Sequence, residues 1–87
     1  MEIAKIKIQN EEGLHLKKAA QVVLCAQKFE SKILLCHQCK QADTCSILQV
    51  LSLGAGHHAD LTVITTGPDE KEAVVGIIEV VSDGTGI

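Results

Sequence analysis

Apolar and polar positions alternate at the start of the chain, where Ala4, Ile6 and Ile8 are separated by lysines. A period of two residues is typical of a strand with one buried face. From residue 16 the apolar spacing changes to three and four positions, which predicts an amphipathic helix over residues 16–28. The predicted apolar face of this helix consists of Leu16, Ala19, Ala20, Val23, Leu24 and Ala26.

The middle of the chain predicts a hairpin followed by a short helix. Residues 32–35 and 40–43 are two expected strands, joined by a tight connection at His37-Gln38-Cys39. A serine and a glutamine three positions apart then form a capping box, which predicts a helix over residues 46–51 that stops before Gly54.

The last third of the chain predicts one more strand and one more helix. Residues 60–66 alternate again, and Asp69 with Glu72 has the spacing of a helix start. The order βαββαβα indicates an α+β fold, a two-layer open-faced sandwich with a four-stranded antiparallel sheet and three helices on one face. We expect a single domain over residues 1–87 with a frayed tail at 82–87. The stripe of the last helix is Ala73, Val74, Ile77, Ile78 and Val81.

Composition narrows the function classes. The 87 residues carry a net charge of −3, and Phe29 is the one aromatic residue, so neither bulk charge nor base stacking favours nucleic-acid binding. No apolar run is long enough for membrane insertion, and the first residues lack the pattern of a secretory signal, so we expect a cytoplasmic protein. All eight basic residues are lysines, so an anion would be held by point charges and backbone amides.

His15 carries the most distinctive candidate chemistry. It follows Gly13 and precedes the first predicted helix, whose first turn contains Lys17 and Lys18. A helix N-terminus presents unpaired N–H groups and partial positive charge, which favours an anion or a phosphoryl group there. The alternative is that both lysines are solvated surface residues and His15 is a cap without function.

The segments Gly13-Leu14-His15 and Ser46-Ile47-Leu48, with the element order, resemble the HPr family, the histidine-containing phosphocarriers of the bacterial phosphoenolpyruvate-dependent sugar phosphotransferase system. The resemblance covers nearly the whole chain. It implies that His15 accepts a phosphoryl group from an enzyme I-type donor and relays it to sugar-specific acceptor proteins. It also implies a transient phosphoryl group in place of a cofactor, and a carrier that is not a stand-alone enzyme.

The resemblance implies further roles for the second predicted helix. Ser46 matches a serine that a regulatory kinase phosphorylates in many relatives, and a transcriptional regulator is a further implied partner. Exposed apolar residues at Ile47, Leu48 and Leu51 match the partner-docking patch. A helix this short cannot turn all three inward, so an apolar surface patch is expected there.

The chain departs from the family pattern directly after the histidine. The family has a small residue, an arginine and a proline, whereas this chain has Leu16, Lys17 and Lys18. Lys17 keeps a cation for phosphate support without the planar fork of arginine, and the backbone amides of residues 16–18 remain to bind phosphate. The departure leaves open a second hypothesis, a binding-only regulatory paralogue with weak or no phosphotransfer.

The cysteines leave a third hypothesis open. The segment Cys36-His37-Gln38-Cys39 resembles half of a zinc site, or a redox pair. The sequence contains no second segment of this kind to complete a zinc site, so Cys45 or a second subunit would have to supply the fourth ligand. The plain alternative is a core thiol at Cys25 and exposed thiols elsewhere. We expect the histidine pair 57–58 to be solvated in its loop.

Overall fold

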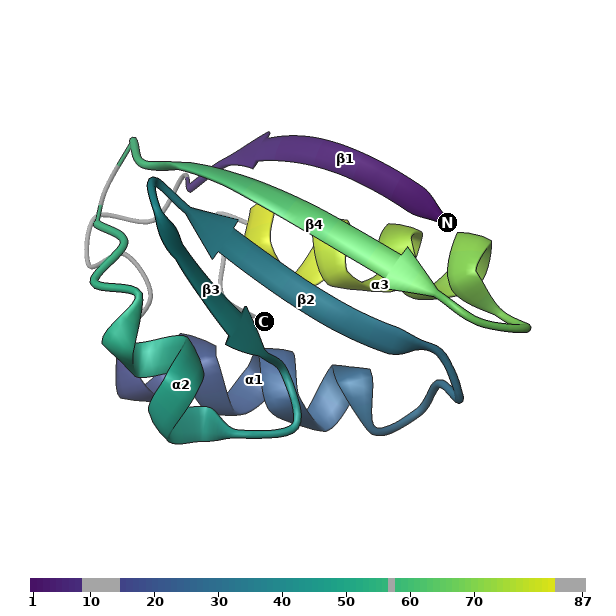
Figure 1. Ribbon diagram of the computed structural model, residues 1–87. Coiled ribbons are helices and arrows are strands. Elements are labelled where there is room, and N and C mark those ends of the chain that lie inside the picture. Colours follow the sequence, from purple (N-terminus) through teal and green to yellow (C-terminus); the bar gives the residue numbers. More distant parts are fainter. Residues whose placement is uncertain (9–14, 57, 83–87) are drawn as a thin grey trace.

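The computed structural model describes residues 1–8, 15–56 and 58–82. The element order confirms the predicted βαββαβα arrangement (Figure 1). The frayed tail was expected over residues 82–87, but Ser82 is the last residue of α3, and residues 83–87 lie outside the described residues. The expected solvation of His57 also lies outside them. The elements are β1 (Glu2–Lys7), α1 (Leu16–Ala26), β2 (Lys32–His37), β3 (Lys40–Asp43), α2 (Ile47–Ser52), β4 (Asp60–Thr66) and α3 (Glu70–Ser82).

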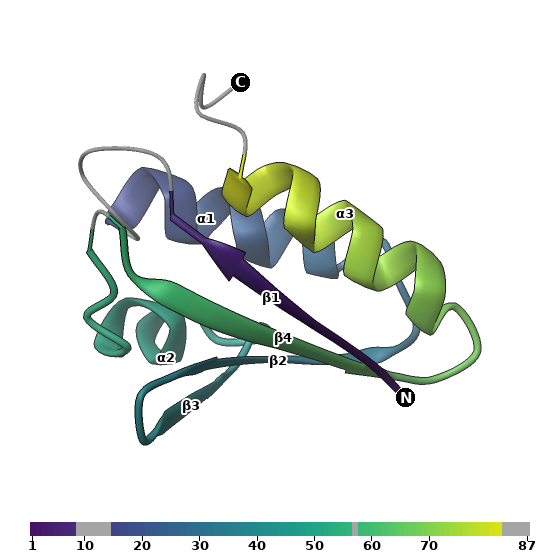
Figure 2. The same ribbon diagram turned by 90° about the horizontal axis from the view of Figure 1, so that it is seen from above.

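The sheet has the strand order β1-β4-β2-β3, and every neighbouring pair is antiparallel. Figure 2 shows α1 and α3 side by side on one side of the sheet and running in opposite directions. The short helix α2 contacts both α1 and the edge strand β3. The predicted open-faced sandwich is therefore confirmed.

The core lies between the sheet and the helices. Alternate residues of the two central strands face the helices and are buried, as a period of two requires. The largest of these side chains are Leu35 of β2 and Leu61 of β4, both with no exposed surface. From α3, Ala73, Ile77 and Val81 close the layer.

The buried face of α1 differs from the predicted one. Leu16 and Leu24 are 64% and 61% exposed, and the buried positions are instead Lys18, Ala19, Val22, Cys25 and Ala26. This face of α1 packs against α3, where a methyl group at Gly76 would lie 2.9 Å from the ring of Phe29 and 3.4 Å from the sulfur of Cys25. The helix also ends two residues earlier than predicted, at Ala26, because the N–H groups of Lys28 and Phe29 donate to carbonyl oxygens three residues back and close a tight turn.

The hairpin between β2 and β3 turns over two residues, Gln38 and Cys39, with His37 paired to Lys40. Strand β2 thus runs two residues further than predicted. Gln38 has a φ of 56°, a conformation that favours glycine.

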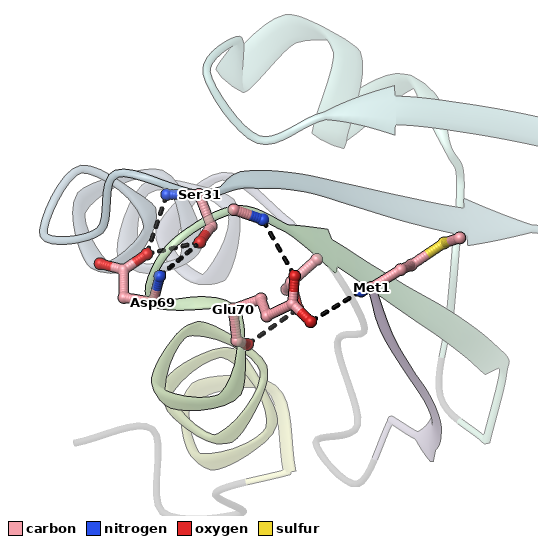
Figure 3. A network of polar contacts seen from close by, with 6 residues as sticks. Met1, Ser31, Asp69 and Glu70 are labelled. Carbon is pink, nitrogen blue, oxygen red and sulfur yellow. Dashed lines mark hydrogen bonds and ion pairs between the residues drawn. The ribbon is translucent and has the colours of Figure 1, made fainter.

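A polar network joins the start of β2 to the turn before α3, at the end of the molecule opposite the start of α1 (Figures 2 and 3). The carboxylate of Asp69 accepts hydrogen bonds from the Ser31 hydroxyl and from the N–H groups of Ser31 and Glu30. These bonds hold the pKa of Asp69 below its ordinary value, and the bond from the Ser31 hydroxyl has the largest effect. The sequence predicts that Asp69 caps the last helix with its side chain, whereas its carboxylate reaches across to β2.

Glu70 completes the network from the first position of α3. Its carboxylate accepts from the N-terminal ammonium of Met1 at 2.7 Å and from the N–H of Gly67 at 3.1 Å. The ammonium is the main reason that the pKa of Glu70 is lowered. The first strand, the turn and α3 are therefore tied together at one corner (Figure 3).

Candidate functional site

His15 is the N-cap of α1, as the sequence predicts. Its backbone is extended, with φ −85° and ψ −176°, and its carbonyl oxygen accepts the N–H of Ala19 at 2.8 Å. The ring nitrogen Nδ1 accepts the N–H of Lys17 at 3.3 Å. Caps are usually short oxygen-bearing side chains, so an imidazole in this place is unusual. Because Nδ1 is an acceptor here, its lone pair points toward the helix N-terminus, and the neutral ring carries its proton on Nε2.

The first turn of α1 is electrostatically suited to an anion. It contains no acidic residue, and the exposed Lys17 adds a positive charge to the partial charge of the helix N-terminus. Leu16, beside the imidazole, is exposed to solvent. The half-buried His15 is thus followed in the chain by one exposed apolar residue, Leu16, and one exposed cation, Lys17.

The alternative that both first-turn lysines are solvated surface residues is wrong for Lys18. Its side chain is only 4% exposed, and its ammonium donates to the carbonyl oxygen of Val80 at 3.0 Å. The residue faces α3, so its side chain points away from any phosphate at the helix start. The burial of Lys18 comes from the packing of α1 against α3, which the local sequence does not show.

Ser46 is the N-cap of α2, as predicted, and its hydroxyl oxygen accepts the N–H of Gln49 at 3.3 Å. The reciprocal half of the capping box does not form. The carboxamide oxygen of Gln49 accepts instead from the N–H of Asp43 at 2.9 Å, and the N–H of Ser46 donates to the Asp43 carbonyl. Ser46 is half-buried and precedes α2, a helix of only six residues.

The apolar residues of α2 are partly exposed and partly packed against the core, because a short helix cannot turn all of them inward. Leu48 is 75% exposed, whereas Ile47 and Leu51 pack in part against the core. The neighbouring α1 exposes Leu16 and Leu24. We call these three exposed side chains, Leu16, Leu24 and Leu48, the exposed leucines of α1 and α2. Periodicity alone assigns the two leucines of α1 to the core, and only the packing of α1 reveals their exposure.

The cysteine segment does not assemble a metal site. Cys36 and His37 follow each other on β2 and therefore point to opposite faces of the sheet. The Nδ1 of His37 lies 3.2 Å from the carbonyl oxygen of Asp60. Over residues 1–8, 15–56 and 58–82, no three His, Cys, Asp or Glu side chains lie close enough together to hold a metal ion. Zinc at Cys36, His37 and Cys39 is not supported.

All four cysteines are free thiols. Cys25 is buried in α1, which agrees with a core role, and burial raises its pKa. Cys45 is exposed, and its hydrogen bond to the carboxylate of Asp43 raises its pKa. Neither thiol is activated as a nucleophile. His58 is exposed with a φ of 70°.

Within the described part of the chain, no helix combines the length and the apolar character that crossing a membrane requires.

Comparisons with known proteins agree with this geometry. The chain matches solved structures of HPr from Thermoanaerobacter tengcongensis (31% identity, TM-score 0.93, 100% of this chain and 98% of that chain) and from Bacillus anthracis (26%, 0.89, 93% and 96%). It also matches Crh, the catabolite repression protein of Bacillus subtilis, solved as a swapped dimer (30%, 0.75, 93% and 93%). A family model described as "PTS HPr component phosphorylation site" matches residues 3–83. The chain therefore belongs to the HPr family, the histidine-containing phosphocarriers of the sugar phosphotransferase system.

Proposed function

We propose that this protein carries a phosphoryl group on His15, accepting it from an enzyme I-type donor in the cytoplasm and passing it to sugar-specific acceptor proteins. The observation that carries the proposal is the contact of Nδ1 with the N–H of Lys17. An unprotonated ring nitrogen aimed at a helix N-terminus is both a nucleophile and the neighbour of an anion site.

The chemistry follows from that contact. The hydrogen bond from the Lys17 N–H to Nδ1 first opens, and the freed Nδ1 lone pair attacks the phosphorus of the donor. A nitrogen–phosphorus bond forms, and the bond from phosphorus to the donor's leaving group breaks. The oxygens of the new phosphoryl group then lie beside the backbone amides of residues 16–18, and the exposed ammonium of Lys17 adds its charge. Transfer to an acceptor reverses the same step. Positioning and charge stabilisation are the main contributions that such a transfer needs from the protein.

The exposed leucines of α1 and α2 provide the proposed docking surface for these partners, together with the partly exposed Ile47 and Leu51. Leu16 stands next to His15 in sequence, so a partner that covers Leu16 also reaches the imidazole. Apolar side chains at the centre of an interface supply most of the binding free energy.

Ser46 is the proposed regulatory site, phosphorylated by a serine kinase and read by a transcriptional regulator. Its hydroxyl is the cap of α2, and a phosphate at a helix N-terminus adds charge without opposing the helix dipole. The new charge would stand two residues from Leu48 and weaken apolar docking there.

A binding-only regulator is the second candidate function. It is favoured by the exposed Leu16 in place of a small residue beside the imidazole. Such a protein would keep Ser46 phosphorylation and partner binding while His15 stayed unreactive.

Phosphorus NMR after incubation with phosphoenolpyruvate and an enzyme I distinguishes the two candidates. The carrier gives a single phosphohistidine signal with the chemical shift of an Nδ1 adduct, absent from His15→Ala and retained in His58→Ala. A folded wild-type protein that stays unlabelled would exclude the carrier and leave the regulator.

A further inference from the structure

Lys18 is a buried charge that the proposed transfer does not use. Its side chain is 4% exposed, although a lysine is almost never this deeply buried without a partner. It also stands in the first turn of α1, where the helix dipole disfavours a cation. Such a residue needs a compensating interaction elsewhere.

That interaction lies in the last turn of α3. The ammonium of Lys18 donates to the carbonyl oxygen of Val80 at 3.0 Å, two residues before α3 ends at Ser82. Carbonyl groups in a last helical turn have no partner within their own helix, and the C-terminus carries partial negative charge. The last turn of α3 has no basic residue of its own. Lys18 therefore supplies from α1 the cation that α3 lacks.

The antiparallel packing of the two helices makes this possible. The start of α1 and the end of α3 lie at the same end of the molecule (Figure 2), and the helices pack directly against each other. His15 and Lys18 are three residues apart, hence on neighbouring positions of the same turn. The bond to Val80 thus fixes the turn that begins at His15.

We propose that Lys18 is a positioning residue, which holds the first turn of α1 against the end of α3 and so orders the amides that receive a phosphoryl group on His15. This inference rests on the proposed function. Lys18 does not touch the phosphoryl group, because its ammonium is directed to α3, and it acts through the backbone of residues 16–18. A displacement of about 1 Å in such a site is enough to lower a transfer rate substantially.

The test loads the protein with phosphoramidate, a small donor that needs no partner protein. Nδ1 of His15 takes the phosphoryl group as the nitrogen–phosphorus bond of phosphoramidate breaks and ammonia leaves. Loading rate and the half-life of the loaded form are followed by intact mass for the wild type, Lys18→Met and Lys18→Arg. Lys28→Met is the matched control, since Lys28 is an exposed lysine just beyond the other end of α1.

We expect Lys18→Met to load about tenfold more slowly and to lose its phosphoryl group about tenfold faster. Lys18→Arg, which keeps a cationic donor, should recover most of both rates, and Lys28→Met should match the wild type. Rates equal to the wild type in a folded Lys18→Met would overturn the proposal and leave Lys18 a role in fold stability alone. If Lys18→Met does not fold, Lys18→Gln takes its place, with the same two outcomes.

The two proposals fail separately. A wild type that loads from phosphoramidate and not from enzyme I would refute the phosphocarrier function, and the comparison of Lys18 variants would still be decided. A wild type that loads from neither donor would refute both.

Discussion

Leu48 and Val50 lie two residues apart on α2, and the structure predicts opposite consequences for the same kind of truncation. Leu48 is 75% exposed and Val50 is fully buried. Leu48→Ala should weaken partner binding and leave the fold intact. Val50→Ala should destabilise the fold and leave the docking surface in place.

The size of each effect follows from burial. Leu48→Ala removes three carbons at about 0.8 kcal/mol each, and three quarters of the side chain is free to be covered by a partner, so the loss is at most about 2 kcal/mol, roughly thirtyfold in Kd. Val50→Ala loses two buried methyl groups and leaves a cavity, for about 2–3 kcal/mol of unfolding free energy. In a domain of this size that lowers Tm by roughly 10–20 °C.

Isothermal titration calorimetry with an enzyme I measures the first effect, and thermal unfolding followed by circular dichroism measures the second. A Kd for Leu48→Ala within twofold of the wild type would refute the docking surface. A large loss of Tm in the same variant would show that Leu48 packs in the core, and the burial argument would then fail as well.

Three further predictions concern the fold. Asp69→Asn should lower stability more at pH 7 than at pH 3. The lowered pKa of Asp69 gives a contribution that is present above its ordinary pKa of about 4 and lost as the pH falls through the folded-state pKa. Urea unfolding at pH 7 and pH 3 tests this, and an equal difference at both pH values would contradict it. Gln38→Gly should raise stability by about 1 kcal/mol because Gln38 has a φ of 56°, and an unchanged urea midpoint would show that the turn is unstrained. Gly67→Ala should cost more than about 2 kcal/mol, since its φ is 151° and a methyl group would lie 2.6 Å from the Cα of Ser31. Gly56→Ala, with open space around it, is the control, and equal stability of the two variants would count against the close approach of Gly67 to Ser31.

The element order was predictable because each segment has its own period and its own boundary residues. The alternation in residues 60–66 predicted β4 to the residue, and Ser46 marked the start of α2. His15 could be placed at a helix start for the same local reason. The sequence did not reveal its contact through Nδ1, because that depends on the ring orientation at the cap.

Features that depend on contacts between distant segments were not predictable. The periodicity of α1 is compatible with more than one buried face, and packing against α3 selected the face with Lys18 and small residues. Leu16 and Leu24 were exposed as a result. The carboxylate of Asp69 was likewise drawn from its own helix to Ser31, which is 38 residues away in the chain.

The most direct test of the carrier function is the intact mass of the protein after incubation with phosphoenolpyruvate and an enzyme I, before and after mild acid treatment. We predict the addition of one phosphoryl group to the wild type, its loss in acid, and no addition to His15→Ala. A folded wild-type protein of unchanged mass, or a label that survives in His15→Ala, would contradict the assignment of His15 as the phosphoryl carrier.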